Sequence, residues 1–448
     1  MRLPDLAVPV LTLFQPTFST PTYHRFLVLL LGAILTTGRR TITNICRTVH
    51  PYAQSHVSSY HRVFSQRRWS AWKLACRLLT FLLTYMVPMG PVLLAGDDTV
   101  AERPGPRVFG KGRHRDGVRS PHSYTAYRWG HTWVVLSVLV KFPFALRPWA
   151  LPVLVALYRD PEWDQAHGTR HKTPAHLARL LLACVVRWFP ARQFIFVGDT
   201  GYGTSETARF CRTHGRHLTL VSKLYGDAAL YAPPPPRMPR TMGRPRVKGR
   251  KLPSPQEVVA NTAQRTRLTV AWYGGSTRDI EGLTGTGHWY RIGADLVEVR
   301  WVHVHDCTGT HRDEYCFTTD ITMKPQQIVE YSTQRWAIET TFQECRDYLK
   351  RESTKGYGHA TVLRLTPCVF GLYTTIVLLY LQLPKTLSTL RVGCWKGKTT
   401  VTFSDRMTCV RRAICEQWLF HTPADRQAFS KLSRSLQDTI LYALAPAA

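Results

Sequence analysis

The sequence predicts an α/β protein whose mixed core is flanked by helical regions at both ends. Short apolar runs typical of buried strands occur at residues 92–99, 131–142 and 193–200, and a helical stretch at 173–189 separates the last two. Four further runs between residues 267 and 320 alternate apolar and polar residues at period two, which predicts a small antiparallel β-unit. Helical periodicity dominates the first 90 residues and returns at 325–350, at 363–381 and from residue 404 onward.

Charge and composition narrow the class of protein. The 448 residues include 59 Lys and Arg against 29 Asp and Glu, a net charge of +30, which excludes an ordinary metabolic enzyme and indicates a polyanionic partner such as DNA. A hydrophobic content of 44% with 13 Trp excludes a disordered basic tail. Eleven cysteines without a CxxC pair predict a reduced, cytoplasmic protein with no disulfide framework or zinc site. The longest apolar run found, 26–36, is too short to span a membrane.

The N-terminal region has the character of a DNA-binding unit. No acidic residue occurs from Leu6 to Gly96, although nine Lys or Arg do. Helices are expected at 23–36, 41–49, 57–64 and 70–86, and the turn at Pro51 gives the second and third the spacing of a helix-turn-helix. The candidate DNA contacts on and after the third of these helices are Arg62, Arg67 and Arg68. The sequence is compatible with two alternatives: these helices read base edges, or they contact phosphates alone.

Two acidic positions stand where apolar strands end. Asp97, with Asp98 beside it, and Asp199 lie 102 residues apart (199 − 97) in equivalent positions. A carboxylate at a strand end can simply form a turn. Adjacent strands would instead bring both carboxylates to one sheet edge, where they repel each other unless a divalent cation binds between them.

A third acid lies on the helix expected at 331–350. At about 100° per residue, one narrow stripe contains Arg335, Glu339, Gln343, Arg346 and Lys350. The adjacent stripe is apolar and can pack on a sheet; it contains Ile338, Phe342, Cys345 and Leu349. The charged stripe is either a solvated face or a metal-binding carboxylate flanked by cations that hold a DNA strand.

These residues carry a resemblance to a known family. GDDT at 96–99, VGDTGYG at 197–203 and QRWAIETTFQECR at 334–346 follow a basic helical N-terminus in this order. Over roughly residues 20–420 the chain resembles DDE transposases of bacterial insertion sequences, in the cut-and-paste superfamily whose third motif is Tyr…Arg…Glu…Lys. The resemblance implies an RNase H-like catalytic core split by a β-rich insertion. It also implies that Asp97, Asp199 and Glu339 bind two Mg²⁺ ions, with Mn²⁺ as a substitute.

The third motif departs from the family in two places. Three residues separate Tyr331 from Arg335, where the family commonly has two, so Tyr331 need not face the phosphate. The distal Lys is replaced by Arg346, which keeps the cation and adds bidentate geometry. By the resemblance, the residues that contact DNA here are Tyr331, Arg335 and Arg346, and the charged stripe adds Lys350 as a further candidate.

Two further sets of side chains are candidates for contact with DNA. Some relatives hold a flipped base against an aromatic ring of the insertion, and Trp289 and Trp301 are candidates, although packing inside the β-unit is the alternative for both. His114, His122 and His131 follow the first Asp, and we expect ordinary polar roles for them and no zinc.

The expected organisation has five parts. They are a helical DNA-binding region (1–90), the first part of the core (91–204), a Pro/Arg-rich linker with the β-rich insertion (205–322), the second part of the core (323–385) and a helical C-terminal region (386–448). The resemblance implies a bacterial, nucleoid-associated transposase that cuts transposon ends and joins their 3′-hydroxyls to target DNA. Its partners would be terminal inverted repeats, target DNA and a second protomer in the synaptic complex. A domesticated or decayed DNA-binding copy and a structure-specific nuclease are the alternatives.

Overall fold

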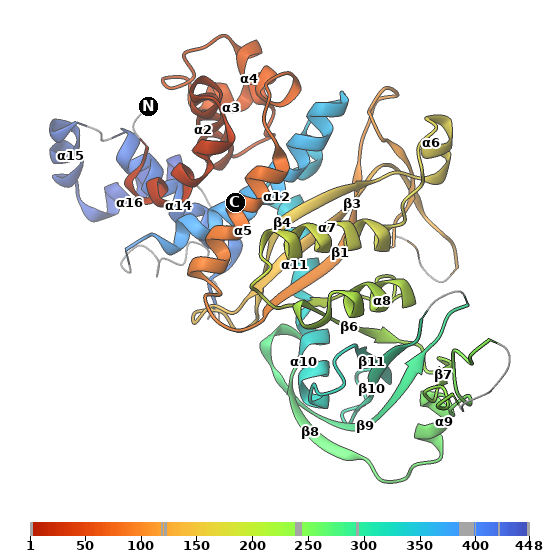
Figure 1. Ribbon diagram of the computed structural model, residues 1–448. Helices are drawn as coiled ribbons and strands as arrows, with labels where there is room; N and C mark the ends of the chain where they lie inside the picture. Colours follow the sequence, from red (N-terminus) through yellow and green to blue (C-terminus); the bar gives the residue numbers. More distant parts are fainter. Residues whose placement is uncertain are drawn as a thin grey trace.

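The computed structural model describes residues 3–117, 120, 123–237, 244–292, 295–384, 398, 400–419 and 422–445. His122 and the end of the expected core at residue 385 lie outside them. Figure 1 shows the helices of both chain ends gathered at one end of a long twisted sheet, whose other end carries the insertion. The predicted α/β class is correct.

The described part of the N-terminal region contains seven helices of different lengths. They are η1 (Asp5–Ala7), α1 (Val8–Leu11), η2 (Thr12–Thr17), α2 (Thr20–Leu35), α3 (Ile42–Thr48), α4 (Val57–Ser65) and α5 (Ala71–Tyr85). The side chains of Thr41 and Ser70 accept hydrogen bonds from the backbone N–H of Asn44 and Lys73, which fixes where α3 and α5 begin. The last four helices agree with the expected segments within a few residues.

The core sheet has the strand order of an RNase H-like fold. Its strands are β1 (Val92–Glu102), β2 (Gly112–Arg115), β3 (Tyr127–Val140), β4 (Trp149–Tyr158), β5 (Phe194–Val197) and β6 (Leu218–Leu224). β1 pairs antiparallel with β3, and β3 with β4, whereas β1, β5 and β6 are parallel. α6 (Pro161–Ala166), α7 (Pro174–Trp188), α8 (Ser205–Thr213) and η3 (Gly215–His217) lie in the connections. Parallel strands require such crossovers.

Strand β4 was not predicted, because Pro152 interrupts its apolar sequence. Proline cannot donate a ladder hydrogen bond and is confined to sheet edges and bulges. Pro152 meets both conditions here: within the described part of the chain β4 pairs only with β3, and the register shifts between Leu136 and Ser137, next to the Ser137–Pro152 pair.

The insertion continues the core sheet instead of forming a separate layer. It comprises β7 (Leu230–Tyr231), α9 (Pro255–Ala260), β8 (Thr266–Ala271), η4 (Tyr273–Gly275), β9 (Thr277–Trp289), β10 (Val297–Asp306) and β11 (Glu314–Thr318). β11 pairs with β6, so the described residues form one eleven-stranded sheet. α8 and β6 fall within 205–322, the expected linker and insertion, although β6 pairs with β5. We therefore propose that the first part of the core extends to Leu224.

The remaining helices follow the insertion. They are α10 (Pro325–Gln334), α11 (Ala337–Asp347), η5 (Arg351–Ser353), α12 (His359–Leu381), α14 (Phe403–Leu419), α15 (Pro423–Ser430) and α16 (Arg434–Leu444). The single helix expected at 325–350 is thus two, joined by Arg335 and Trp336. α11 and the turn that follows it bury the expected apolar stripe: Ile338, Phe342, Cys345 and Leu349 are all at most 6% exposed.

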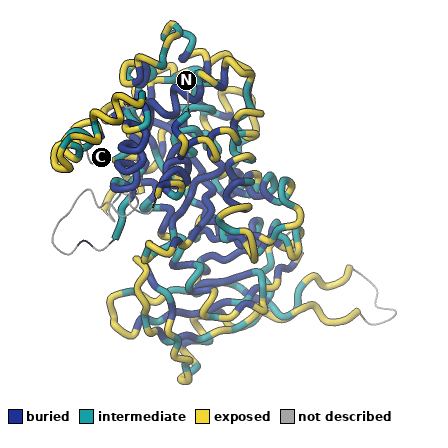
Figure 2. Tube along the Cα trace, turned by 90° about the vertical axis from the view of Figure 1, so that its left-hand side faces the viewer, coloured by how far each residue is buried: buried dark blue, intermediate teal, exposed yellow. Residues whose placement is uncertain are grey.

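α12 lies between the sheet and the helices of both chain ends. By length and composition α12 could cross a membrane, although 61% of its most apolar window is buried inside the fold. The expectation that 26–36 is the longest apolar segment was therefore wrong. α12 packs against β4, α4, α5 and α14. In Figure 2 the buried residues form a continuous region that extends from these helices into the sheet.

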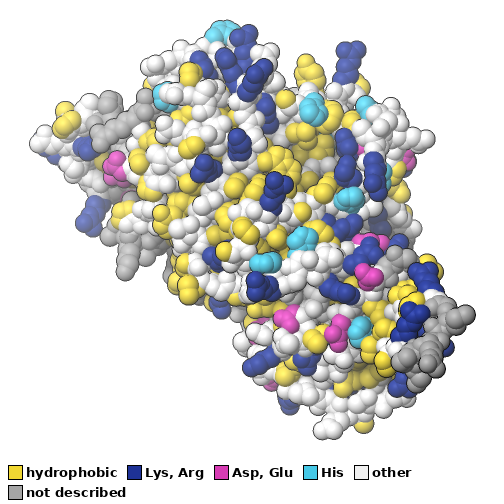
Figure 3. Space-filling model, in the orientation of Figure 1, with side chains coloured by type: hydrophobic (Ala, Val, Ile, Leu, Met, Phe, Trp, Pro, Cys, Tyr) yellow, Lys and Arg dark blue, Asp and Glu magenta, His cyan; other side chains and the backbone are white. Residues whose placement is uncertain are grey.

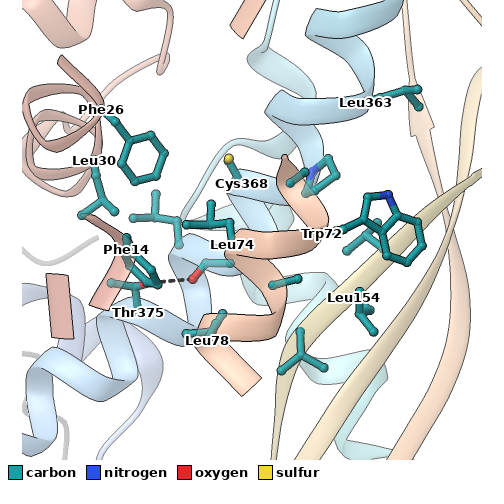
Figure 4. A pocket seen from close by; sticks show the side chains of 17 residues that line it. Phe14, Phe26, Leu30, Trp72, Leu74, Leu78, Leu154, Leu363, Cys368 and Thr375 are labelled. Atoms are coloured by element: carbon teal, nitrogen blue, oxygen red, sulfur yellow. Dashed lines mark hydrogen bonds between the residues drawn. The ribbon is translucent and has the colours of Figure 1, made fainter. Parts of the chain in front are cut away.

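The N-terminal helices share this core. Phe14, Phe26 and Leu30 face Leu154 of β4 and Cys368 of α12 across a small apolar cavity of about 70 Å³ (Figure 4). The N-terminal region is therefore not an independent lobe, because its apolar faces are buried against the rest of the molecule.

Candidate active site

The two aspartates meet because β1 and β5 are adjacent and parallel. Leu93 pairs with Ile195 and Ala95 with Val197, both at an offset of 102 residues. Asp97 lies two residues beyond Ala95 on β1, and Asp199 lies two residues beyond Val197, the last residue of β5. The two acids therefore come from corresponding ends of adjacent strands, close enough for the charge of Asp199 to act on Asp97.

Asp199 begins a tight turn. Its Oδ1 accepts hydrogen bonds from the backbone N–H groups of Gly201 (2.8 Å) and Tyr202 (3.2 Å). The glycines of the motif are needed for close packing: a Cβ at Gly198 would collide with Tyr202, and one at Gly203 with Ser222. The turn fixes the direction of the carboxylate.

Asp98 belongs to the opposite face of β1. Its Oδ1 accepts a hydrogen bond of 2.9 Å from the hydroxyl of Tyr202, whose side chain is only 2% exposed. Asp97 instead contacts Arg335, at the junction of α10 and α11. Successive residues of a strand point to opposite faces, so α11 and the segment leading into α8 cover different faces of β1.

Arg335 lies between the first and third acids. Its Nη1 donates to Oδ2 of Asp97 (2.5 Å) and its Nη2 to Oε1 of Glu339 (2.8 Å). The side chains of Arg335 and Asp97 are 13% and 15% exposed, and that of Glu339 is 35% exposed. Burial lowers the pKa of Arg335, but Asp97 and Glu339 outweigh it and leave the pKa raised. The guanidinium is thus a firmly held counter-ion.

The acids nevertheless repel one another. Burial, together with the charges of Asp98 and Asp199, raises the pKa of Asp97 to about 7 despite the opposing effect of Arg335. Burial and Asp199 likewise raise the pKa of Asp98. The carboxylates therefore repel one another even with Arg335 in place, and additional positive charge would stabilise them.

The donor set suits a divalent cation of the Mg²⁺ type. Asp97, Asp199 and Glu339 supply only carboxylate oxygens, the ligands that hard cations prefer. Among the described residues, however, no group of three or more His, Cys, Asp and Glu side chains is spaced to hold a metal ion. In this structure Arg335 binds one carboxylate oxygen of Asp97 and one of Glu339.

The predicted DNA-contacting side chains lie in different surroundings. Arg346 is exposed on α11, and Tyr331 is half-buried on α10. Lys350 is exposed but has a left-handed backbone (φ 50°) beyond the end of α11, so it does not continue the helical stripe. Arg335 points to acids and is not a free cation. Exposed side chains on and after α4 include Arg62, Arg67 and Arg68.

The two tryptophans of the insertion are packed within it. Trp301 is 3% exposed and its indole covers Gly285. Trp289 is half-buried, with its ring perpendicular to that of Phe317 at 5.4 Å. Trp301 is therefore not available to stack on a base; it packs inside the β-unit instead.

Several residues near the site escaped sequence reasoning. Arg351, 1% exposed, donates to Oγ1 of Thr99 and to the backbone carbonyl of Val100, which fixes β1 just beyond the acids. Nothing in the sequence distinguishes it from the cations around it. The His303-Val304-His305 spacing was also overlooked, and both rings contact Asp313, at 2.9 and 2.7 Å.

Comparison with known proteins identifies a family, and the similar solved structures include a remote one. A model of the DDE superfamily endonuclease family matches residues 13–279, more than half of the chain, including Asp97 and Asp199 but ending before Glu339. The cryo-EM structure of a piggyBac transposase synaptic complex with hairpin DNA aligns with 98% of this chain and 81% of its own, at 10% identity and a TM-score of 0.42. The family assignment does not depend on this remote similarity. No curated protein sequence matches the chain.

Proposed function

The chain belongs to the DDE superfamily of endonucleases, and from this premise we propose that it is a DNA transposase. It would cut the ends of a mobile element and join the freed 3′-hydroxyls to target DNA. The observation that supports this most is the link of Asp97 and Glu339 through Arg335, with Asp199 close enough for its charge to act on both Asp97 and Arg335.

In this proposal the three carboxylates would hold two Mg²⁺ ions, or Mn²⁺ in their place. Such ions lower the pKa of the attacking water or hydroxyl and stabilise the leaving oxygen. The chain's own residues bind and orient the DNA. Arg335 must release Asp97 and Glu339, and its guanidinium then becomes available to a backbone phosphate. Arg346, exposed on the following helix α11, would contact the neighbouring phosphate.

Recognition of the element ends is assigned to the N-terminal region. α3 and α4 form two successive short helices, and Figure 3 shows Lys and Arg side chains gathered over them. The exposed cations Arg62, Arg67 and Arg68 would contact phosphates, and the exposed part of α4 would enter a groove. Synapsis of two ends requires a second protomer, so we propose a dimer on DNA.

Glu339→Gln in the full chain tests the proposal. The amide keeps the side-chain volume and an oxygen acceptor for Arg335 but removes the charge that a hard cation needs. We expect folding and end binding to survive, while Mg²⁺-dependent nicking and strand transfer on a plasmid carrying the flanking inverted repeats fall by orders of magnitude. Mn²⁺ should restore a trace.

A matched control lies five residues further along the same helix. Glu344 accepts a hydrogen bond from Tyr373 (2.6 Å), and burial raises its pKa. Glu344→Gln should keep cleavage. Near wild-type nicking by Glu339→Gln would refute the assignment of the three acids. Cleavage of branched DNA without strand transfer would instead identify a structure-specific nuclease.

A further inference from the structure

Beyond the site itself, the start of β3 and strand β2 form a two-stranded ribbon with an unusual exposed face. Arg113 lies directly opposite Trp129, and Arg115 opposite Tyr127. Directly opposed residues of an antiparallel pair project from the same face. Tyr127 and Trp129 are 52% and 60% exposed, and both arginines are exposed as well. The face therefore presents two aromatic rings and two cations to solvent.

The rings and cations of this ribbon are in contact. The guanidinium of Arg113 lies 4.3 Å from the centre of the Tyr127 ring, and the ammonium of Lys111 lies 5.6 Å from that of Trp129. The opposite face of the ribbon is covered: His114 is 5% exposed, and Arg128 forms an ion pair of 2.6 Å with Asp116. Exposure is thus confined to the face that carries the aromatic rings.

A groove of about 670 Å³ adjoins this face. Trp129 and Lys111 line it together with Arg107, and α6 contributes Trp163 and His167. The rings of Trp163 and His167 are stacked at 3.8 Å and 10°. The groove also contains Glu102, which pairs with Arg128 at 3.6 Å. Figure 3 shows Lys, Arg and His side chains over the side of the molecule where α6 lies.

The ribbon is related to the acids by the register of β3. Asp97 pairs with Val135, and the alternation of the pleat puts Tyr127, Trp129 and Val135 on one face. Six residues separate Trp129 from Val135, or about 20 Å at roughly 3.3 Å per residue. A DNA strand passing the acids could therefore reach the ribbon after about six base pairs at 3.4 Å each.

We propose that this ribbon and groove, here named the stacking groove (Lys111, Arg113, Tyr127, Trp129, Trp163 and His167), bind unpaired nucleotides of a DNA strand. Exposed aromatic rings give bases a surface on which to stack, and interleaved cations neutralise the backbone. A duplex keeps its bases stacked internally and cannot use the rings. This inference rests on the proposed DNA substrate but requires no cleavage.

Binding of a labelled oligothymidylate and of a blunt duplex of the same length tests the proposal, with the full chain in chelator. Tyr127→Ala and Trp129→Ala should each weaken oligothymidylate binding about tenfold, and change duplex binding by less than about twofold. Arg113→Gln should lower the log–log salt slope for the single strand by about 0.7. Tyr442→Ala, at a tyrosine that is also 52% exposed, is the matched control.

Wild-type affinity of both aromatic variants for oligothymidylate would overturn the stacking groove. An equal loss on duplex would also overturn it, since the ribbon would then be a general phosphate surface. Glu339→Gln should bind oligothymidylate like the wild type, so failure of the cleavage proposal and failure of the stacking groove remain distinguishable. Melting temperatures of the variants verify folding, which both exposed positions should tolerate.

Discussion

Arg335 and Asp97, 238 residues apart in the chain, are joined by a hydrogen bond of 2.5 Å between Nη1 and Oδ2. The same guanidinium binds Glu339 four residues further along. Because Asp97 and Asp98 of β1 lie close to Asp199, this arrangement places a protein cation where mutual repulsion is greatest. We interpret Arg335 as the counter-ion of the acids before divalent cations and DNA bind.

Arg335→Gln should therefore destabilise the protein in chelator. Removing one partner of a buried ion pair costs about 3 kcal/mol in free energy of unfolding. Mg²⁺ should raise the melting temperature of this variant more than that of the wild type, because the freed carboxylates gain the cation without displacing an arginine. Arg346→Gln, at an exposed position of the following helix α11, is the control. An Arg335→Gln protein as stable as the wild type in chelator would exclude the counter-ion role.

The two neighbouring aspartates should differ in function. Asp97→Asn should abolish Mg²⁺-dependent nicking as Glu339→Gln does, and the two losses should not add because both disable one site. Asp98→Asn should keep most of the activity, since the amide oxygen still accepts the hydroxyl of Tyr202, at about 1 kcal/mol of lost stability. Nicking by plasmid relaxation distinguishes them. The reverse pattern would move the first ligand to Asp98.

Local patterns predicted those parts of the fold that local interactions determine. The N-terminal helices were found because capping residues and apolar periodicity occur within each segment, as at Thr41 and Ser70. The proximity of Asp97 and Asp199 was predictable because both follow apolar runs typical of buried strands, and those strands are neighbours in the sheet. Strand β4 was missed because Pro152 interrupts its apolar sequence; the edge position of β4 and the bulge beside Pro152 together accommodate it.

Side-chain partners from distant segments could not be predicted. Arg335 was expected to hold phosphate, but its partner Asp97 comes from a strand more than 200 residues earlier. The burial of Trp301 depends on close contact with Gly285 across the β9–β10 pair. Lys350 leaves the helical stripe because α11 ends at Asp347, a change that the charge pattern does not reveal.

Arg346 should matter more for cleavage than for binding. If it holds the phosphates of the strand being cut, Arg346→Ala should reduce nicking about tenfold or more while changing end-binding affinity little, since a charge-assisted bond contributes about 1.5–3 kcal/mol. Arg346→Lys should keep part of the activity because it retains the charge without the bidentate geometry. Arg216→Ala, at another exposed arginine, serves as the control. Equal losses of binding and nicking would place Arg346 in a general DNA surface.

His131 should make the fold sensitive to mild acid. The side chain is fully buried on β3, and its Nε2 contacts the carbonyl of Phe109 at 2.9 Å. Burial, together with the charges of Arg103 and His114, lowers the pKa of His131 to about 4 despite the opposing effect of that hydrogen bond. Above about pH 6.5 the ring is neutral in both the folded and the unfolded protein. Between about pH 6.5 and 4 only the unfolded chain takes up the proton, so stability falls by up to about 3 kcal/mol. Urea unfolding at several pH values measures this loss. His131→Gln, which cannot titrate, should show a shallower decline, and an unchanged slope would exclude His131 as its source.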